Sequence, residues 1–569
     1  MCGIAGVIDK KRATDSRRRE RVVRNMLRLM KHRGFDAHGI KSTDNVSIGH
    51  TRLSILDLSR RGDQPFSDEN LNSALSFNGE LYNHDRLRKK YLDDIRINSN
   101  SDTATLFELL KKFPIESVLK KIHGMFAFSF LNNKSSNLVL AIDRFSIKPL
   151  YYVNTPEYFA WASEIKAFSA LPKHKFQLNK KVIGEYLIFR HVSGPETLFK
   201  NIHKLQAGEY LTYNLVNKTI KVKKYYKLQK SRCHQDFLEN ILSSSVKAHL
   251  MGDIIAGVQL SGGVDSSLVA LFAQKFSKKK LHTFSIGLND KKWNEFHYSD
   301  FIANKLGTNH HKIIFSKKDF VRLLPRIIYH LDVPITHPNT VPMYILAKEA
   351  RKCTKVLLTG EGADEVFCGY NRYFQKNEKD KGLIYSNAFS SPQDVAKIFK
   401  GHISVVNRKK IVRGLNGLKR EDKMSFYDIY TYLPHVLLRQ DKAGMAANIE
   451  NRVPFLYTSV VEMGFNSKTK VGRFGGKTQI KELALKYLPK DLVLRRKCGF
   501  GLPISEWLRD KDGLLSHLSN LTKSKVIKEF FDVNAIKQLI EEHLVEEVDN
   551  SPILFTLISL SMWHDTFIN

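Results

Sequence analysis

The sequence predicts an α/β protein whose carboxy-terminal half contains a doubly wound parallel sheet with helical additions. Strand-like apolar runs at 254–260, 281–286, 310–315 and 356–358 alternate with helical patterns, for example at 301–306. Alternation at this spacing is typical of a parallel sheet. Two of the strands end in glycine-rich loops, and ligands of such sheets bind beyond the carboxyl ends of the strands. We therefore expect the two loops to face each other across one crevice.

The first loop, Ser261-Gly262-Gly263-Val264-Asp265-Ser266, has the features of a nucleotide site. A strand that turns through glycines into a helix directs several backbone N–H groups at one point, where the helix dipole favours an anion. Asp265 adds carboxylate oxygens, which Mg²⁺ prefers as ligands. No Gly-Lys-Ser/Thr sequence follows the glycines, so this is not a Walker loop.

This loop resembles the Ser-Gly-Gly-x-Asp-Ser signature of the PP-loop ATP pyrophosphatases. The resemblance implies that ATP is cleaved to AMP and pyrophosphate. The alternative interpretation is an ordinary glycine-rich turn between a strand and a helix. The match at Ser261, Gly262, Gly263, Asp265 and Ser266, in the predicted strand–turn–helix context, argues against that alternative.

The second loop, Thr359-Gly360-Glu361-Gly362-Ala363-Asp364-Glu365, follows the strand at 356–358. If the two loops share one crevice, Asp265 and Asp364 can hold Mg²⁺ together on the phosphates of ATP. Glu361 would then lie near a reacting carboxylate. A solvated charge is the alternative for either acidic residue alone.

Composition indicates a soluble globular protein, with 42% hydrophobic residues. No apolar run reaches the roughly 18 residues that a transmembrane helix needs. The first residues lack the basic region of a signal peptide. The five cysteines lie far apart and form no C-x-x-C pair, which argues against a disulfide framework or a zinc site and favours a reducing compartment. We expect a cytoplasmic protein without a transmembrane segment.

The net charge of +34 raises the question of a polyanionic partner. The lysines are scattered apart from short clusters such as 17–19 and 278–280, a pattern typical of solvated faces. We therefore expect small-molecule substrates and no nucleic acid. A nucleic-acid-modifying enzyme with a PP-loop is the rival hypothesis, and salt-sensitive RNA binding would support it.

The chain begins Met1-Cys2-Gly3-Ile4. If Met1 is removed, Cys2 carries both a thiol and a free α-amine. A thiol needs a base to become a nucleophilic thiolate near neutral pH, and an α-amine with an ordinary pKa of about 8 can be that base. A buried small side chain at the start of a strand is the alternative.

Three further features of the amino-terminal half suit an amino-acid amide as substrate. Arg52 could bind an α-carboxylate in a fork, and Asp102, at the cap of a predicted helix, could bind an α-ammonium. We interpret Asn78-Gly79 as a turn after a strand at 75–77, where the Asn side chain and the Gly N–H could stabilise an oxyanion.

With these residues the first half resembles the class II glutamine amidotransferase domain, an N-terminal-nucleophile (Ntn) hydrolase. The whole chain resembles the glutamine-hydrolysing asparagine synthetase family. The resemblance implies an αββα sandwich at 1–215, followed by a PP-loop ATP pyrophosphatase domain at 216–569. It implies Cys2 as nucleophile, with Asn78 and Gly79 as oxyanion hole. It also implies a glutamine site formed by Arg52, Leu53, Ser54, Ile55, Asn78, Gly79, Glu80 and Asp102.

In the second half the resemblance implies that Leu260 and Ile286 contact adenine, that Thr359 and Gly360 contact ATP, and that Glu361 takes part in forming an acyl-adenylate. Lys497 would reach the pyrophosphate, with a surface lysine as the alternative. The stretch 438–456 matches a helical region that lines the synthetase cleft. The chain departs from its relatives at Phe35 and Tyr457, where they usually have Pro and Asp.

The predicted reaction is glutamine-dependent amide synthesis with ATP and Mg²⁺. Aspartate, giving asparagine, is the leading acceptor, because the match covers nearly the full length. A uronic acid of a surface polysaccharide is the alternative acceptor, and the segment 332–340 borders the predicted acceptor pocket. A non-catalytic binding or storage protein is the third hypothesis, disfavoured because Cys2, Asp265 and Glu361 are all present. The oligomeric state stays open, a homodimer included.

Overall fold

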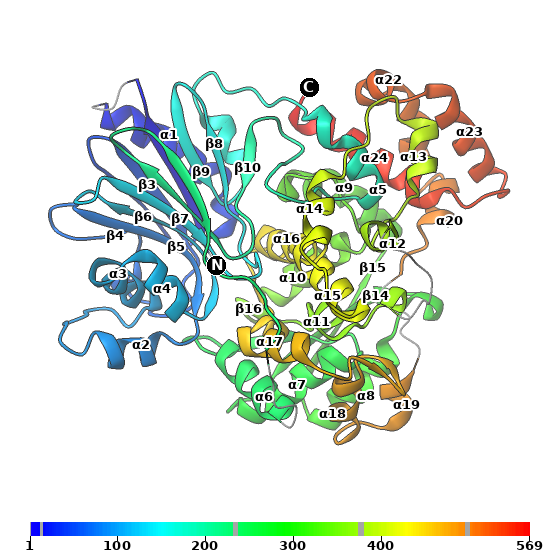
Figure 1. Ribbon diagram of the computed structural model, residues 1–569. Helices are drawn as coiled ribbons and strands as arrows, with labels where there is room; N and C mark the ends of the chain where they lie inside the picture. The colour runs from blue at the N-terminus through cyan, green and yellow to red at the C-terminus, as the bar shows by residue number, and fades with distance from the viewer. Residues whose placement is uncertain (1, 12–14, 232–236, 374–380, 496–500) are drawn as a thin grey trace.

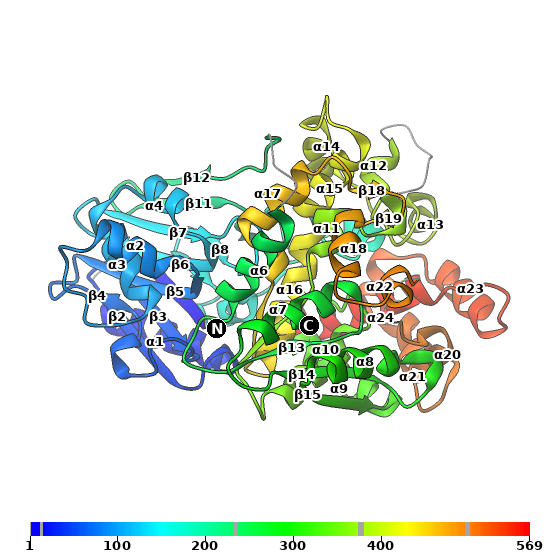
Figure 2. The ribbon, with the colours of Figure 1, turned by 90° about the horizontal axis from the view of Figure 1, so that it is seen from below.

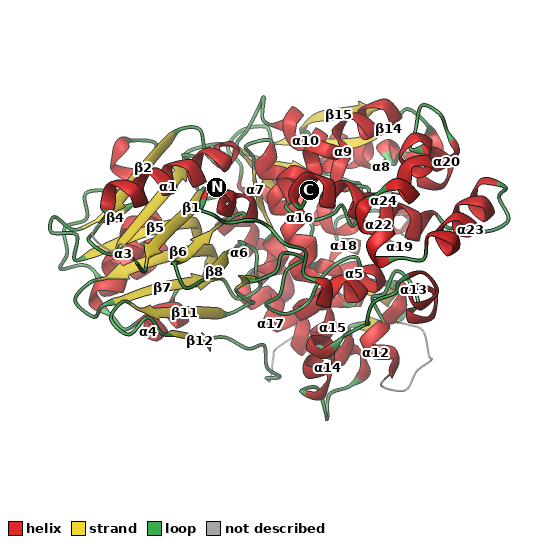
Figure 3. Ribbon diagram, turned by 90° about the horizontal axis from the view of Figure 1, so that it is seen from above, coloured by secondary structure: helices red, strands yellow, loops and turns green. Residues whose placement is uncertain are grey.

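Two stacked antiparallel sheets form the amino-terminal half, and a parallel sheet wrapped in helices forms the rest (Figure 1). The computed structural model describes residues 2–11, 15–231, 237–373, 381–495 and 501–569. Viewed from above, strands dominate the first half and helices the second (Figure 3).

The first sheet has the strand order β10-β8-β9-β1-β3-β2. Its strands are β1 (Gly3–Asp9), β2 (Ala37–Ser42), β3 (Val46–Arg52), β8 (Tyr151–Asn154), β9 (Tyr158–Ala162) and β10 (Ile202–Lys204). The first described residues thus form an interior strand, β1, which pairs with β3 and β9. Helix α1 (Ser16–Leu29) packs on this sheet through Val23 and Met26, both fully buried.

The second sheet has the order β12-β11-β7-β6-β5-β4. Its strands are β4 (Phe66–Ser67), β5 (Ser73–Leu81), β6 (Gly124–Asn132), β7 (Asn137–Ile142), β11 (Glu209–Asn214) and β12 (Ile220–Lys224). Its outer face is covered by α2 (His84–Tyr91), α3 (Asp102–Lys112) and α4 (Ile115–Lys121). Ile4, Ile48, Leu140 and Trp161 are buried between the two sheets. The predicted αββα sandwich is confirmed.

The predicted domain boundary near 215 stays a prediction. Strand β12 lies beyond that position and pairs with β11, so the second sheet continues to residue 224.

The parallel sheet has five strands in the order β15-β14-β13-β16-β17. They are β13 (Ala256–Gln259), β14 (His282–Leu288), β15 (Asn309–Phe315), β16 (Val356–Leu358) and β17 (Glu450–Arg452). Every pairing among them is parallel, as predicted. The interpretation of 438–456 as helical is right for α16 (Leu433–Ala446) and wrong for 450–452. Those residues form the edge strand β17 beside β16, a pairing that no local pattern reveals.

Helices surround this sheet on both faces (Figure 2). Helices α7 (Val264–Phe276), α8 (Phe296–Leu306) and α10 (Thr340–Ala350), together with α16, contact its strands. Further helices of this half are α6 (Leu238–His249), α9 (Lys317–Leu331), α11 (Ala363–Phe367), α17 (Thr458–Asn466) and α18 (Thr478–Leu485). The others are α5 (Ile183–Phe189), α12 (Lys381–Tyr385), α13 (Pro392–Ile398), α14 (Val406–Arg413), α15 (Arg420–Thr431), α19 (Lys490–Leu494), α20 (Ile504–Arg509), α21 (Leu515–Asn520), α22 (Lys525–Phe530), α23 (Val533–Leu544) and α24 (Ser551–Phe567). A short hairpin, β18 (Val471–Gly472) with β19 (Gly475–Gly476), precedes α18.

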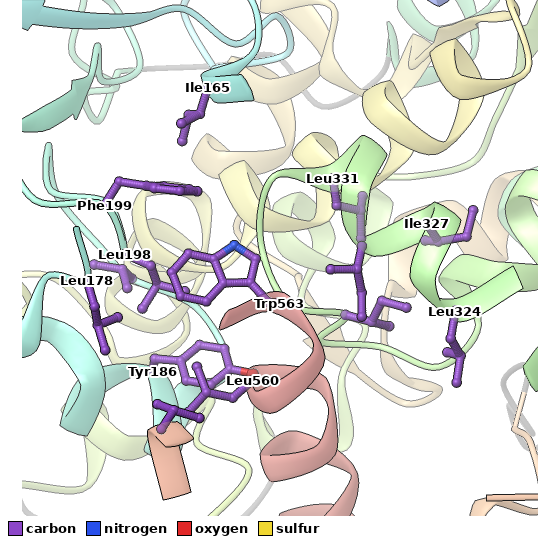
Figure 4. Packing of buried hydrophobic residues seen from close by; sticks show 14 of the residues in the cluster. Ile165, Leu178, Tyr186, Leu198, Phe199, Leu324, Ile327, Leu331, Leu560 and Trp563 are labelled. Atoms are coloured by element: carbon purple, nitrogen blue, oxygen red, sulfur yellow. The ribbon is translucent and has the colours of Figure 1, made fainter. Parts of the chain in front are cut away.

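The carboxy-terminal helix α24 closes a core that is shared by both halves. Trp563 lies among Leu198 and Phe199 of the first half and faces Leu331 of α9 (Figure 4). Its indole Nε1 donates a hydrogen bond to the Asp332 carbonyl at 3.0 Å. Among the described helices, none is both long and apolar enough to cross a membrane.

The buried His50 of β3 makes the stability of this sandwich dependent on pH. Burial lowers the pKa of His50 to about 3, although its ring Nε2 lies 3.1 Å from the Phe77 carbonyl. Below about pH 6.5 the imidazole of His50 is protonated in the unfolded chain but stays neutral in the folded chain. The free energy of unfolding therefore falls as the pH drops below about 6.5.

We expect His50→Gln to gain about 2 kcal/mol relative to the wild type between pH 7.5 and pH 5.0, because glutamine does not titrate. Urea unfolding at both pH values measures the difference, and His297→Gln, at an exposed histidine, controls for the substitution itself. An equal effect of His50→Gln at both pH values would show that the imidazole is not the cause.

Candidate active sites

Cys2 lies at the start of β1 and is held by backbone contacts on both sides. Its backbone N donates to Asn78 Oδ1 at 3.0 Å, and its carbonyl accepts from Arg33 Nε at 2.9 Å. The nitrogen bonded to Asn78 is the atom that becomes the α-amine if Met1 is removed. Burial raises the pKa of the Cys2 thiol, so a thiolate here needs a nearby base.

Asn78 and Gly79 lie within strand β5, so their interpretation as a turn is wrong. They pair with Ala127 and Phe126 of β6. The glycine that suggested a turn is required by this pairing, because a Cβ on Gly79 would lie 2.0 Å from the Met125 carbonyl oxygen of β6. In the described part of the chain, Asn78 Nδ2 is buried without a hydrogen-bond acceptor. It is therefore available as a donor beside Cys2.

Arg52 ends β3 and is bound by its own surroundings. Its NH1 lies 2.7 Å from Asp63 Oδ1 and 2.9 Å from the Ser59 carbonyl. Leu53, Ser54 and Ile55 follow it, and Ser54 N donates to Asp36 Oδ2 at 2.7 Å. Beside them is a cavity of about 520 Å³, lined among others by Asp36, Arg52, Ser54, Asp63 and Lys355. Of the residues predicted for glutamine, Arg52 and Ser54 line this cavity, whereas Cys2, Asn78 and Asp102 are not part of its lining.

Asp102 opens α3 but does not cap it. Ser101 is the cap, since its Oγ accepts from Ala104 N at 3.2 Å. The Asp102 carboxylate instead accepts from Leu81 N at 2.7 Å and joins α3 to the end of β5. Burial raises the pKa of Asp102 and, more strongly, that of Glu80. Glu80 faces the second half, with Oε1 3.2 Å from Arg452 NH2.

The loop after β13 has the predicted strand–turn–helix form. Ser261 Oγ accepts from Gly263 N at 3.3 Å, and α7 begins at Val264. Gly262 has a φ of 73°, the left-handed region that favours glycine. A Cβ on Gly360 would lie 2.9 Å from the Asp265 Cβ and 3.0 Å from Ser266 N. The two glycine loops therefore touch, as expected of one shared crevice.

The remaining residues predicted for ATP lie around this contact. Leu260 is buried, and its N donates to the Phe284 carbonyl at 2.8 Å. Ile286 lies on β14, next to β13. Thr359 N donates to the Arg452 carbonyl of β17 at 2.9 Å. Lys497 lies outside the described residues.

Asp265 and Asp364 come together on one cation, Lys477. Its Nζ lies 2.6 Å from Asp265 Oδ2 and 2.8 Å from Asp364 Oδ1. Asp265 Oδ1 is buried and accepts no hydrogen bond from the described residues. Carboxylate oxygens that converge in this way fit Mg²⁺, a hard cation.

Glu361 belongs to a second polar group, which it forms with Arg439 and Asn339. Arg439 NH2 lies 3.5 Å from Glu361 Oε1, and Arg439 NH1 donates to Asn339 Oδ1. Asn339 belongs to the segment 332–340, which we predicted to border the acceptor pocket. Arg439, on α16, thus links Glu361 to that segment.

Each half of the chain matches a known protein family. The family model described as asparagine synthase matches residues 238–565, and the one described as glutamine amidotransferase domain matches residues 1–226. The chain belongs to the asparagine synthase family.

Three curated relatives of this asparagine synthase-family chain are similar over most of its length. Asparagine synthetase (glutamine-hydrolysing) 1 of Bacillus subtilis is 29% identical over 99% of this chain and 96% of its own. Asparagine synthetase B of Escherichia coli is 29% identical over 87% of this chain and 81% of its own. Asparagine synthetase 3 of Bacillus subtilis is 27% identical over 91% and 92%. The predicted class, an ATP-dependent ligase with a glutamine amidotransferase domain, is confirmed.

Sequence reasoning missed Lys477 in this asparagine synthase-family chain. It follows the hairpin of β18 and β19 in the run Gly475-Gly476-Lys477-Thr478 and precedes α18. Its φ of 57° and ψ of 32° are left-handed, a conformation that costs about 1–3 kcal/mol outside glycine and clusters at functional sites. Glycines followed by Lys-Thr at a helix start were the available signal.

Sequence reasoning also missed a buried group of charges between the two sites. Arg33 is fully buried and bonds three partners, with NH1 2.9 Å from Glu164 Oε1 and NH2 2.9 Å from Asp441 Oδ2 in addition to the Cys2 carbonyl. Burial lowers the pKa of Arg33, but the carboxylates of Asp441 and Glu164 outweigh burial and raise that pKa above its ordinary value. The signal was the presence of charges in otherwise apolar runs, such as Ser163-Glu164-Ile165.

We expect Arg33→Met to lower the free energy of unfolding by about 3–5 kcal/mol, because two buried carboxylates each lose a partner, although Lys166 stays beside Glu164 and Lys148 beside Asp441. Urea unfolding measures the loss. Arg322→Met is the matched control, since the side chain of Arg322 is 73% exposed beside Asp319 and its pair contributes about 0–1 kcal/mol. A loss for Arg33→Met no larger than that of the control would overturn the stabilising role of the buried group.

Proposed function

We propose that this protein makes asparagine from aspartate, with glutamine as nitrogen donor and ATP as energy source. The observation that carries the proposal is the joint presence of two sites in one chain. Cys2 and Asn78 are hydrogen-bonded in the first half, and Asp265 and Asp364 converge in the second. The full-length similarity to relatives named asparagine synthetase supports the choice of product.

In the first half, the Cys2 thiolate attacks the side-chain carbonyl carbon of glutamine. The carbon–nitrogen bond breaks, ammonia leaves, and a γ-glutamyl thioester remains until water releases glutamate. Asn78 Nδ2 and the Gly79 N–H stabilise the oxyanion of each tetrahedral intermediate. The α-amine of Cys2, held by Asn78 Oδ1, takes the thiol proton and gives it to the nitrogen that leaves as ammonia.

Arg52 and Asp102 hold the glutamine. Because Arg52 already bonds Asp63, substrate binding exchanges part of that contact for the α-carboxylate of glutamine. Asp102 and Glu80 lie close to the end of β5 and attract the α-ammonium group.

In the second half, a carboxylate oxygen of the acceptor attacks the α-phosphorus of ATP, and pyrophosphate leaves. Ammonia then attacks the acyl carbon of the adenylate, giving the amide and AMP. The loop N–H groups at Ser261, Gly262 and Gly263 bind phosphate oxygens. Ser261 N and Gly263 N exchange their contacts with Ser266 Oγ and Ser261 Oγ for the phosphate. Asp265 and Asp364 are the residues that would hold Mg²⁺, which neutralises phosphate charge when bound. Lys477 is placed to contact the leaving pyrophosphate as a compact charge.

In this proposal the acceptor binds beside Glu361 and Arg439, whose side chains lie 3.5 Å apart. A cationic guanidinium beside Asn339 suits a small dicarboxylic amino acid, because Arg binds carboxylates in a fork. A uronic acid is the alternative acceptor, since it carries the same reacting group.

The acceptor and both sites are tested by one assay with purified protein, glutamine, ATP, Mg²⁺ and aspartate. We expect glutamate, AMP, pyrophosphate and asparagine in equal amounts. Cys2→Ala should abolish the glutamine-dependent reaction and keep the ammonia-dependent one, because only the first site uses the thiol. Glutamate release without aspartate-dependent AMP would reject aspartate and direct the search to uronates.

We expect Lys477→Met to lower the rate of AMP formation by at least about 100-fold, the effect of removing one charge-stabilising donor from a transition state. Glutamine hydrolysis in the absence of ATP should be unchanged. Lys486→Met is the matched control, since Lys486 pairs with Glu239 on the surface. If both lysine variants keep the wild-type rate of AMP formation, Lys477 has no part in the reaction.

A further inference from the structure

Three side chains with metal-binding atoms lie together at the amino-terminal edge of the parallel sheet. His282 is the first residue of β14, His311 lies near the start of β15, and Cys353 lies in the turn between α10 and β16. Their ligand atoms all lie within 4.8 Å of one another. The nucleotide loops follow the carboxyl ends of β13 and β16, so this cluster lies at the opposite edge of the sheet.

The two imidazoles are held in position by ring stacking. Phe284 pairs with His311 in the parallel register of β14 and β15. The ring of His311 lies 4.7 Å from the ring of Phe284 and 5.2 Å from that of His282, with interplanar angles of 13° and 22°. His282 Nδ1 and His311 Nε2 lie 2.9 Å apart. Phe284 packs in a buried cluster with Leu346 of α10, and this packing holds the Phe284 end of the stack in position.

Cys353 is presented by an anchored turn. Its backbone N donates to the Ala350 carbonyl at the end of α10 at 2.9 Å. The next residue, Thr354, is buried and donates through Oγ1 to the Ile255 carbonyl. Cys353 itself is exposed. The thiol therefore lies at the open side of the cluster, where an ion and a water molecule can enter.

We propose that His282, His311 and Cys353 form a site for one divalent cation of the zinc class, with water as the fourth ligand. Two imidazoles and a thiolate are ligands that zinc prefers, whereas Mg²⁺ prefers oxygen. His282 Nδ1 and His311 Nε2, 2.9 Å apart, are close enough to bind one ion together. A tetrahedral zinc ion requires about 3.3 Å between the nitrogens, from bonds of about 2.0–2.1 Å. Because both rings are only half-buried, they can make this small movement.

The site joins three neighbouring parts of the sheet: β14, β15 and the turn that leads into β16. A metal bound there ties α10 to the strands on which it packs. We therefore assign it a stabilising role that is independent of the amide-forming reaction.

The test is a titration of metal-free, full-length protein with Co²⁺, followed by displacement with Zn²⁺. We expect one Co²⁺ per chain with a thiolate-to-cobalt charge-transfer band, which Zn²⁺ abolishes. Cys353→Ser should lose the band, and His282→Asn and His311→Asn should each weaken binding by at least about ten-fold. His297→Asn, at an exposed histidine on α8, should bind like the wild type.

A second readout is the thermal unfolding midpoint. Zn²⁺ should raise it in the wild type and in His297→Asn but not in Cys353→Ser, since a ligand that binds the folded state stabilises it. Cys353→Ser changes one exposed atom, so its fold is retained. A charge-transfer band that persists in Cys353→Ser, unchanged affinity in both histidine variants, or an equal Zn²⁺ effect on the midpoint in all variants would overturn the proposal.

Discussion

The buried guanidinium of Arg33 is the contact on which the joining of the two halves depends. Placing a charge in a dry interior costs several kcal/mol unless good partners surround it. Arg33 meets this requirement with the Cys2 carbonyl, Glu164 and Asp441. Asp441 belongs to α16 of the second half, so the strand that begins beside Cys2 and the second half are tied to the same side chain. The first sheet cannot shift relative to α16 without exposing a buried charge.

A second buried arginine, Arg452, repeats this arrangement. Its side chain contacts Glu450 on its own strand and Glu80 of the predicted glutamine site. Burial lowers the pKa of Arg452, but these carboxylates outweigh burial and raise that pKa above its ordinary value. Its backbone carbonyl accepts from Thr359 N in the second glycine loop. One residue of the short strand β17 therefore touches the surroundings of both sites.

The sequence was sufficient for the features that local patterns encode. Apolar periodicity and glycine loops predicted the parallel sheet, the order of its first four strands along the chain, and the contact between the loops. It was insufficient where long-range pairing overrides a local preference. Asn78-Gly79 has the composition of a hairpin turn, yet β6 pairs with both residues and requires the missing Cβ of Gly79.

The same limit applies to the candidate sites. Lys477 stands out only through its contacts with Asp265 and Asp364, which lie more than a hundred residues before it in the sequence. The absence of a C-x-x-C pair argued against a zinc site, and the site that we propose has no such pair, because His282, His311 and Cys353 come from three separate elements that the sheet brings together. Spacing rules find ligands that share one loop, and cannot find ligands that meet through parallel pairing.

The two candidate sites also share a support that is independent of the buried arginines. Asp253 N donates to the Ile55 carbonyl at 2.9 Å, and Asp57 N donates to Asp253 Oδ2 at 2.9 Å. Asp253 lies just before β13, and the loop predicted to bind the nucleotide lies just after it. Because β13 is only four residues long and is paired on both sides, a displacement at the predicted glutamine segment reaches the loop through a stiff element. The central strand of the second domain thus fixes the position of both sites, one at each end.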